Sequence, residues 1–281
     1  MKRSSVRSHI EGAANTLREA GVDSPEVDAR LLAAHVLGVA PMQRMFADVP
    51  AGFGERYTEL VARRTKREPL QHIIGTAPFY GVDLAVGPGV FIPRPETEVL
   101  AEWAVHKLID APPAPTVVDL GSGTGALAIA IARDRPDATV YAVERSEAAC
   151  AYLQRNVDTF APQVNVVAGD MTDPGLLAEI RADVVVSNPP YVPETPELQQ
   201  EVYADPHEAV FSGADGMAAI RGIVPVVKQM LKDGGVVGIE HDDTTSEDVQ
   251  DELRAGGFAD VRALKDMTGR ARFVTASKLA R

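Results

Sequence analysis

The feature that most constrains the fold is an alternation of strand-like and helix-like segments between residues 116 and 277. Short apolar runs bounded by turn residues are typical of buried strands, and longer amphipathic stretches are typical of helices. The expected strands are Thr116–Leu120, Thr139–Glu144, Val164–Val167, Val184–Ser187, Val236–Glu240, Val261–Leu264 and Phe273–Ser277. The expected helices between them cover residues 126–132, 146–160, 216–231 and 245–255. This pattern predicts an α/β fold with a mixed, mostly parallel seven-stranded sheet, covered on both faces, and one antiparallel strand at its edge.

Residues 1–72 differ from this pattern and are expected to form a small helical domain. One helix should stop at Gly21, a second should run from the Ser24-Pro25 start to Gly38, and a third should cover residues 54–67. The third helix carries the basic residues Arg63, Arg64, Lys66 and Arg67. Because acidic residues lie beside them, a solvated helix face is favoured over a contact surface for a partner.

Residues 73–98 connect the two regions and are rich in glycine and proline. The short runs Phe79–Tyr80 and Val82–Val86 predict a β-hairpin, which a stiff connector follows. Arg94 and Glu96 in the connector could lock it or line a substrate entrance. The remaining domain is expected to span residues 99–281.

The net charge of -12 is distributed unevenly. Residues 1–70 carry 11 basic and 9 acidic side chains, or +2, which leaves 17 basic and 31 acidic side chains, or -14, for the rest. Tight binding to a phosphate backbone is therefore not expected. The single cysteine, Cys150, excludes a disulfide framework. The chain has neither a signal-peptide core nor an apolar run of about 18 residues, so a soluble cytoplasmic protein without membrane contact is expected.

A glycine-rich turn follows the first strand of the alternating region. Asp119 lies near the end of that strand, and the turn contains Gly121, Ser122, Gly123, Thr124 and Gly125. Glycines allow close approach of a ligand to the backbone, and Glu144 at the end of the next strand could accept both hydroxyls of a ribose. The pattern therefore predicts a nucleoside-containing ligand. A dinucleotide remains possible, but Asp119 would repel a pyrophosphate and would attract an ammonium group, which favours S-adenosyl-L-methionine.

The tetrad Asn188-Pro189-Pro190-Tyr191 follows a buried strand and is expected at the same sheet edge. Two prolines stiffen the turn, so that the Asn188 side-chain oxygen and the Pro189 carbonyl could accept both hydrogens of a planar amino group. Tyr191 could pack on that group and face a sulfonium charge. This arrangement predicts methyl transfer from sulfur to nitrogen, in which positioning supplies most of the catalysis.

With these motifs the chain resembles the protein-(glutamine-N5) methyltransferases of the PrmC/HemK family, the bacterial release factor glutamine methyltransferases. The resemblance covers nearly the whole chain, including the segment at 91–98 and residues 119–125, 187–191 and 214–220. It implies a Rossmann-like methyltransferase domain that uses S-adenosyl-L-methionine, with an N-terminal substrate-recognition domain. The implied substrate is the Gly-Gly-Gln glutamine of peptide chain release factors 1 and 2.

The resemblance also implies roles for individual residues. Donor contacts fall on residues 121–125, Glu144, Met171 and Asn188, and the tetrad would hold the glutamine. Met171 stands where an aromatic residue is common, and Asp170 could accept the adenine amino group.

Several alternatives remain open from the sequence. An N6-adenine nucleic-acid methyltransferase would suit the same tetrad, as would a ribosomal-protein glutamine methyltransferase, and a nicotinamide-dependent oxidoreductase would suit the glycine turn. The histidines lack the spacing of metal ligands, so no metal site is expected. The acidic cluster of residues 240–243 is interpreted as a solvated strand end rather than a cation site.

Overall fold

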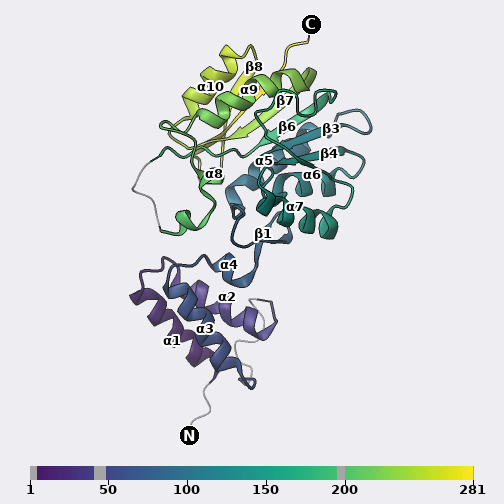
Figure 1. The fold of residues 1–281 in the computed structure, drawn as a ribbon. Coiled ribbons are helices and arrows are strands. Elements are labelled where there is room, and N and C mark those ends of the chain that lie inside the picture. The colour runs from purple at the N-terminus through teal and green to yellow at the C-terminus, as the bar shows by residue number, and fades with distance from the viewer. Residues whose placement is uncertain (1–4, 41–48, 195–199, 281) are drawn as a thin grey trace. The chain divides into compact units, whose positions relative to one another are not determined.

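The computed structural model describes residues 5–40, 49–194 and 200–280. The chain divides into two compact units, which can be followed by colour in Figure 1. Unit 1 contains residues 1–76 and 199–204, and unit 2 contains residues 77–198 and 205–281.

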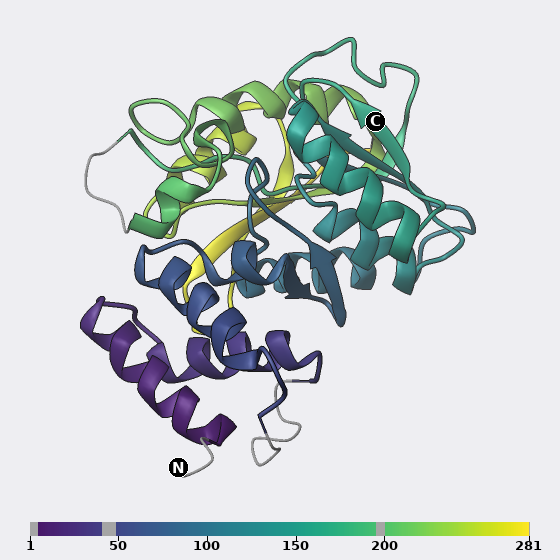
Figure 2. The ribbon, with the colours of Figure 1, turned by 60° about the horizontal axis from the view of Figure 1, so that its bottom comes forward.

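Unit 1 is a bundle of helices, which the purple and blue ribbon of Figure 2 shows. It has its own apolar core. Its helices are α1 (Val6–Glu19), α2 (Pro25–Leu37), α3 (Phe53–Thr65) and the short α4 (Leu70–Ile74), and the 3-10 helix η2 (Gln200–Ala204) belongs to the same unit. Leu17 and Leu32 are fully buried between α1, α2 and α3. Gly38 ends α2 in the left-handed conformation, as a helix C-terminus commonly requires. The predicted N-terminal helices are confirmed, whereas α4 was not foreseen.

The prediction that the basic run forms a solvated helix face is wrong for Arg64. Its side chain is buried, and its Nε donates to Asp28 Oδ2 at 2.7 Å. Arg64 Nη1 donates to Glu201 Oε1 of η2 at 3.2 Å. Arg67 donates to the same carboxylate through Nε at 2.5 Å and through Nη2 at 2.6 Å. The sequence does not reveal these acceptors, because Asp28 and Glu201 lie far from α3 along the chain.

Unit 2 contains the seven-stranded sheet that the sequence predicts. Its strands are β3 (Thr116–Leu120), β4 (Thr139–Glu144), β5 (Asn165–Ala168), β6 (Ala182–Ser187), β7 (Leu231–Glu240), β8 (Ala259–Lys265) and β9 (Ala271–Ser277). They are arranged in the order β5-β4-β3-β6-β7-β9-β8, and β3 to β7 run parallel. The α/β class is confirmed.

The position predicted for the antiparallel strand is wrong. Strand β9 is antiparallel to both neighbours and lies between β7 and β8 rather than at the edge. Phe273 and Val274 of β9 are fully buried on opposite faces, whereas most of β8 is exposed or half-buried. The more apolar strand of this hairpin therefore occupies the interior position.

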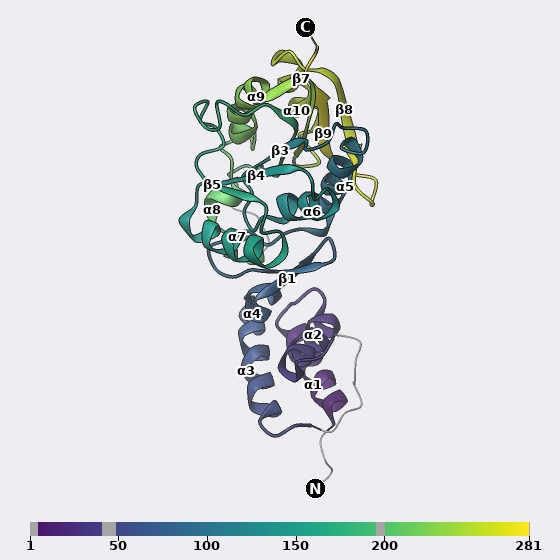
Figure 3. The same ribbon diagram turned by 90° about the vertical axis from the view of Figure 1, so that its right-hand side faces the viewer.

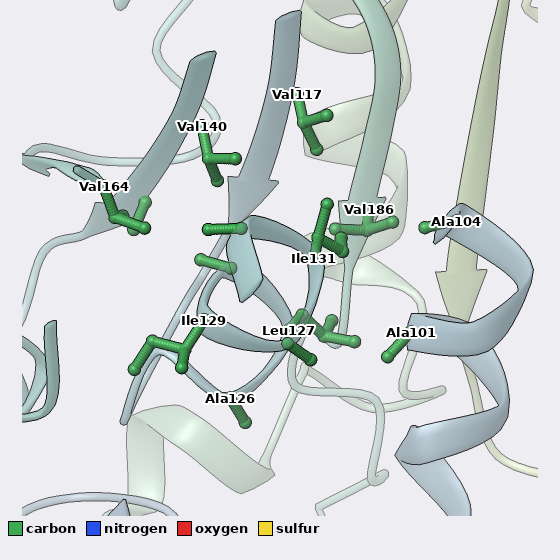
Figure 4. Packing of buried hydrophobic residues seen from close by; sticks show 14 of the residues in the cluster. Ala101, Ala104, Val117, Ala126, Leu127, Ile129, Ile131, Val140, Val164 and Val186 are labelled. Carbon is green, nitrogen blue, oxygen red and sulfur yellow. The ribbon is translucent and has the colours of Figure 1, made fainter. Parts of the chain in front are cut away.

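Helices cover both faces of this sheet, as Figure 3 shows. One face packs against α5 (Glu98–Lys107), α6 (Ala126–Asp134) and α7 (Glu147–Phe160), and the other packs against α9 (Ala218–Met230) and α10 (Ser246–Ala255). Figure 4 shows Val117, Val140 and Val186 of neighbouring strands around α6. Alternate strand residues, such as Val118 and Val185, face the second layer. Helix α5 is not among the helices expected from the sequence.

Smaller elements complete unit 2, apart from Thr76, which is assigned to unit 1. They are the hairpin of β1 (Thr76–Phe79) and β2 (Val82–Ala85), the 3-10 helix η1 (Pro95–Thr97) and α8 (His207–Val210). Asn156 of α7 fixes the hairpin, because its Oδ1 accepts from the Ala85 N–H at 2.7 Å. No helix in the described part of the chain is long and apolar enough to cross a membrane.

Candidate active site

The sequence-predicted site residues follow the carboxyl ends of parallel strands. Leu120 at the end of β3 pairs with Ser187 at the end of β6, so Gly121 and Asn188 leave adjacent strands at the same edge. Glu144 ends β4 on the other side of β3, and Asp170 lies just after β5. The Ser187 hydroxyl donates to the Leu120 carbonyl at 2.7 Å and fixes the start of the tetrad against the glycine turn. Open α/β sheets bind ligands at this edge.

The glycine turn has the backbone conformation for which glycine is needed. Gly121, Gly123 and Gly125 have φ values of 76°, 54° and 85°. A Cβ atom at Gly121 would lie 3.2 Å from Met171 Sδ, so the Met171 side chain lies directly against the turn. Thr124 is buried, and its carbonyl accepts from Asn156 Nδ2 at 3.0 Å. The turn is thus fixed by neighbouring elements before any ligand binds.

Asp119 lies beneath this turn with an unsatisfied oxygen. Its Oδ2 accepts from the Ala128 N–H at 3.2 Å, but its buried Oδ1 has no hydrogen-bond partner among the described residues. Burial raises the pKa of Asp119 to about 7, although interactions with the Ser122 side chain and the Ala128 N–H act in the opposite direction. A buried acceptor without a donor is costly, and a ligand ammonium group would supply that donor.

Glu144 is held by the backbone on three sides. Its Oε2 accepts from the Gly123 N–H at 2.9 Å, and its Oε1 accepts from the N–H groups of Arg145 and Ser146, both at 2.8 Å. An ionised carboxylate has about four acceptor positions, so this arrangement leaves capacity for one further donor. Glu144 could therefore accept one ribose hydroxyl, and a second would need to replace the Gly123 N–H as a donor to Oε2.

Asp170 lies at the third strand end. The Thr172 N–H and hydroxyl donate to its Oδ1 at 2.8 and 2.7 Å, and these bonds lower its pKa. Its Oδ2 accepts from Arg145 Nη1 at 3.3 Å. The carboxylate is therefore ionised and keeps acceptor capacity on Oδ2.

The tetrad contacts two residues that the sequence analysis did not assign to the site. Asn188 Nδ2 donates to Thr97 Oγ1 at 3.3 Å, and the Tyr191 hydroxyl donates to Glu240 Oε1 at 3.2 Å. Pro189 is buried, and Pro190 is partly buried. Burial, with the nearby Glu240 charge, raises the pKa of Tyr191 well above its usual value. The Tyr191 side chain is therefore neutral and able to donate.

The interpretation of residues 240–243 as a solvated strand end is wrong for its first two residues. Glu240 is 2% exposed and His241 is 0% exposed. Burial raises the pKa of Glu240 to about 7, partly offset by hydrogen bonds from Thr97 and Tyr191. Burial also lowers the pKa of His241, whose Nδ1 contacts the Asp242 carbonyl at 2.7 Å. Pairing of β7 with β9 through Glu240 and Phe273 covers this strand end, which local sequence cannot show.

Arg94 holds the connector in place. Its Nη2 donates to Asp205 Oδ2 at 2.7 Å, its guanidinium lies 4.9 Å from the centre of the Phe91 ring, and the Ile92 N–H also donates to Asp205. Of the two roles open from the sequence, these contacts give Arg94 the locking one.

Two family models match the chain. The PrmC N-terminal domain matches residues 9–75, and the methyltransferase small domain matches residues 87–235. Solved structures share the fold at low sequence identity. A 16S rRNA methyltransferase of Thermus thermophilus, in complex with AdoMet and guanosine, has a TM-score of 0.53 at 23% identity, covering 73% of this chain and 50% of its own. The catalytic domain of hMettl16 has a TM-score of 0.56 at 16% identity, covering 82% of both chains.

Curated relatives match over nearly their full length. The release factor glutamine methyltransferase of Corynebacterium glutamicum is 56% identical over 96% of this chain and 98% of its own. Its counterpart from Mycolicibacterium smegmatis is 52% identical over 98% of this chain and 99% of its own. The protein of that name from Mycobacterium tuberculosis is 43% identical over 97% of this chain and 91% of its own. With this similarity along both units, the chain belongs to the release factor glutamine methyltransferase family.

Proposed function

We propose that this protein transfers a methyl group from S-adenosyl-L-methionine to the side-chain amide nitrogen, N5, of the glutamine in the Gly-Gly-Gln motif of peptide chain release factors 1 and 2. The observation that carries this proposal is the position of Asn188. Its amide lies at the strand edge beside the glycine turn, and its Nδ2 is bonded to Thr97. The opposite branch of the amide, Oδ1, is then the acceptor for a substrate N–H.

The donor-binding residues fit the parts of S-adenosyl-L-methionine. The unsatisfied Oδ1 of Asp119 would take its ammonium group, and Glu144 would take a ribose hydroxyl. Met171 and Asp170 would face the adenine, because Met171 lies against Gly121 and Asp170 Oδ2 retains acceptor capacity. The backbone of residues 121–125, including Ser122 and Thr124, would approach the ligand closely.

The bound donor supplies an electrophilic methyl carbon. Asn188 Oδ1 and the Pro189 carbonyl would hold the two N–H bonds of the substrate amide, so that the nitrogen faces this carbon. The neutral ring of Tyr191 would pack on the amide and face the sulfonium. In the transfer, the N–C bond would form as the S–C bond of the donor breaks, and the nitrogen would release one of its protons to solvent.

The division of labour between the domains is part of the proposal. Residues 1–72 would recognise the release factor, residues 73–98 would serve as hairpin and connector, and residues 99–281 would perform the chemistry. Since release factors act on the ribosome, we place the protein in the cytoplasm. The charge of -14 beyond residue 70 disfavours stable nucleic-acid binding and hence the N6-adenine alternative.

Mass spectrometry of a purified, unmethylated release factor tests this function. After incubation with the protein and S-adenosyl-L-methionine, we expect the mass of one methylene to be added at the Gly-Gly-Gln glutamine. Asn188→Ala should abolish the addition. Asn165→Ala, which removes a side-chain bond to the Val140 carbonyl at the start of β5, should retain it. An unmodified release factor with the wild-type protein would refute the proposal, and methylation of a ribosomal protein or DNA instead would favour an alternative.

A further inference from the structure

Thr97 is placed at a helix start but does not serve that helix. It occupies the N-cap position of α5, yet its side chain makes no capping hydrogen bond. The residue is buried, and its hydroxyl contacts Asn188 and Glu240 instead. Because η1 runs into α5 through Thr97, whose φ and ψ are -63° and -19°, this helix start does not depend on a cap from the Thr97 side chain, which is used for the contact with Asn188.

Glu240 connects the two ends of the tetrad. Its Oε1 accepts from the Tyr191 hydroxyl at 3.2 Å, and Thr97, which contacts Asn188, also bonds its side chain. Its second oxygen, Oε2, is buried without a hydrogen-bond partner in the described part of the chain. Keeping a largely unsatisfied carboxylate in the interior costs stability, which indicates that something other than stability retains it.

The hydrogen bonds at Thr97 determine how Asn188 is oriented. A hydroxyl has a single proton, and an ionised carboxylate can only accept, so above pH 7, where Glu240 is ionised, the Thr97 proton is directed toward Glu240, whose pKa it lowers. The lone pair that remains on Thr97 Oγ1 must then face a donor, which is Asn188 Nδ2 at 3.3 Å. The Asn188 amide is therefore prevented from rotating by half a turn, and Oδ1 points away from Thr97.

We infer that Thr97 and Glu240 are positioning residues for methyl transfer, which fix the Asn188 amide and the Tyr191 ring in the orientation that receives the substrate amide. This inference rests on the proposed function, because it assigns a task to the same tetrad. Neither residue needs to touch the substrate. Both lie outside the glycine turn, which would make most of the donor contacts, so their removal should affect turnover far more than donor binding.

The first experiment compares Thr97→Val, which keeps the shape and removes the hydroxyl, with Thr97→Ser, which keeps the hydroxyl. We expect Thr97→Val to lower kcat for release factor methylation by roughly 100-fold, the scale of loss that a small misplacement causes. Thr97→Ser should restore kcat to within about threefold of wild type, and the KM for S-adenosyl-L-methionine should change by less than about twofold in both. The matched control is Thr245→Val, since Thr245 is also buried at the start of a helix but bonds the Asp242 carbonyl.

A double-mutant cycle with Glu240→Gln tests whether the two residues act as one unit. Glu240→Gln alone should lower kcat by roughly fivefold or more, and adding it to Thr97→Val should cause little further loss, because coupled residues are not additive. Equal kcat values for Thr97→Val and Thr97→Ser would overturn the inference. An unchanged kcat in Glu240→Gln would also overturn the inference, even if Thr97→Val failed to fold.

A second measurement does not depend on activity. In nuclear magnetic resonance spectra, the side-chain NH2 signals of Asn188 should be similar in wild type and Thr97→Ser, and should shift or broaden in Thr97→Val. Unchanged signals in Thr97→Val would contradict the inference, whatever the substrate. Failure of the wild-type protein to methylate a release factor would instead refute the proposed function, and the spectra would still decide the role of Thr97.

Discussion

Asp119 couples donor binding to pH at the scale of a single residue. Its pKa is raised from 3.8 to about 7 by burial, so the free protein holds a proton there that an ammonium group must displace. We expect affinity for S-adenosylhomocysteine, which carries the same ammonium, to fall by up to roughly tenfold for each pH unit below 7. Isothermal calorimetry between pH 5.5 and 7 should also show proton release. An identical pH dependence in Asp119→Asn would contradict this assignment.

Glu240 links stability to pH, but in the opposite direction, because protonation of Glu240 favours the folded state. Its pKa is about 7 in the folded state and 4.5 in an exposed chain, so the folded state binds the proton more tightly. The contribution of Glu240 to the free energy of unfolding should therefore be highest below pH 4.5 and should fall by at most about 3 kcal/mol as pH rises to 7. Glu240→Gln should gain stability relative to wild type between pH 5 and 8. Urea unfolding, followed by the fluorescence of Trp103, the one tryptophan of the chain, measures this difference in the free energy of unfolding. A difference that stays constant with pH would exclude Glu240 as the source.

The sequence reveals the site residues that form contiguous motifs and conceals those that do not. Residues 119–125 and 188–191 carry their geometry in local glycine and proline patterns, so their place at one sheet edge could be predicted. Thr97 lies 91 residues along the chain from Asn188, to which it is hydrogen-bonded. Glu240 lies 49 residues from its own partner, Tyr191. Only the folded sheet brings them there. Burial of a charged side chain likewise depends on tertiary packing, so the burial of Arg64 and Glu240 could not be predicted from the local sequence.

At the scale of elements, the loop between α8 and α9 supports the tetrad through Gly216. Its φ is +75°, and a Cβ atom there would overlap the Tyr191 carbonyl and lie 3.2 Å from Pro193 Cδ. Gly216→Ala should therefore displace the tetrad backbone and lower kcat by roughly 100-fold, with donor affinity nearly unchanged. Gly234→Ala is the control, because its φ is +82° but no atom lies within 4 Å. Equal activity of the two variants would show that backbone strain alone, rather than overlap with the tetrad, decides the effect.

Element boundaries follow local sequence signals, but element order does not. The left-handed glycine at the end of α2 and the Ser146 cap, whose Oγ accepts from the Ala149 N–H, mark helix ends that the sequence predicted. Helix α5 was missed because it directly follows a proline-rich connector and has buried residues, such as Leu100 and Ala104, within a short and weakly patterned stretch. The insertion of β9 between β7 and β8 depends on which strand of a hairpin is more apolar on both faces. The sequence pattern alone left that choice open.

At the scale of the whole molecule, the two units have separate apolar cores. The core of unit 1 is formed by residues 6–74, and the cores on the two faces of the sheet use residues 79–276. Leu32 is fully buried in the first, and Leu127 is buried in the second. Each Leu→Ala substitution should cost about 2–5 kcal/mol in its own unit, because it leaves a cavity.

The two substitutions should therefore give different results by one optical probe. Trp103 lies in α5 and packs against the core of unit 2. Leu127→Ala should lower the urea midpoint of its fluorescence, whereas Leu32→Ala should leave that midpoint unchanged and increase hydrogen exchange in α1, α2 and α3. Under the proposed function, Leu32→Ala should also raise the KM for the release factor while donor affinity stays constant, since the N-terminal helices serve recognition. Equal shifts of the Trp103 midpoint in both variants would show that the units unfold as one cooperative body, and recognition could then not be weakened without weakening the catalytic unit.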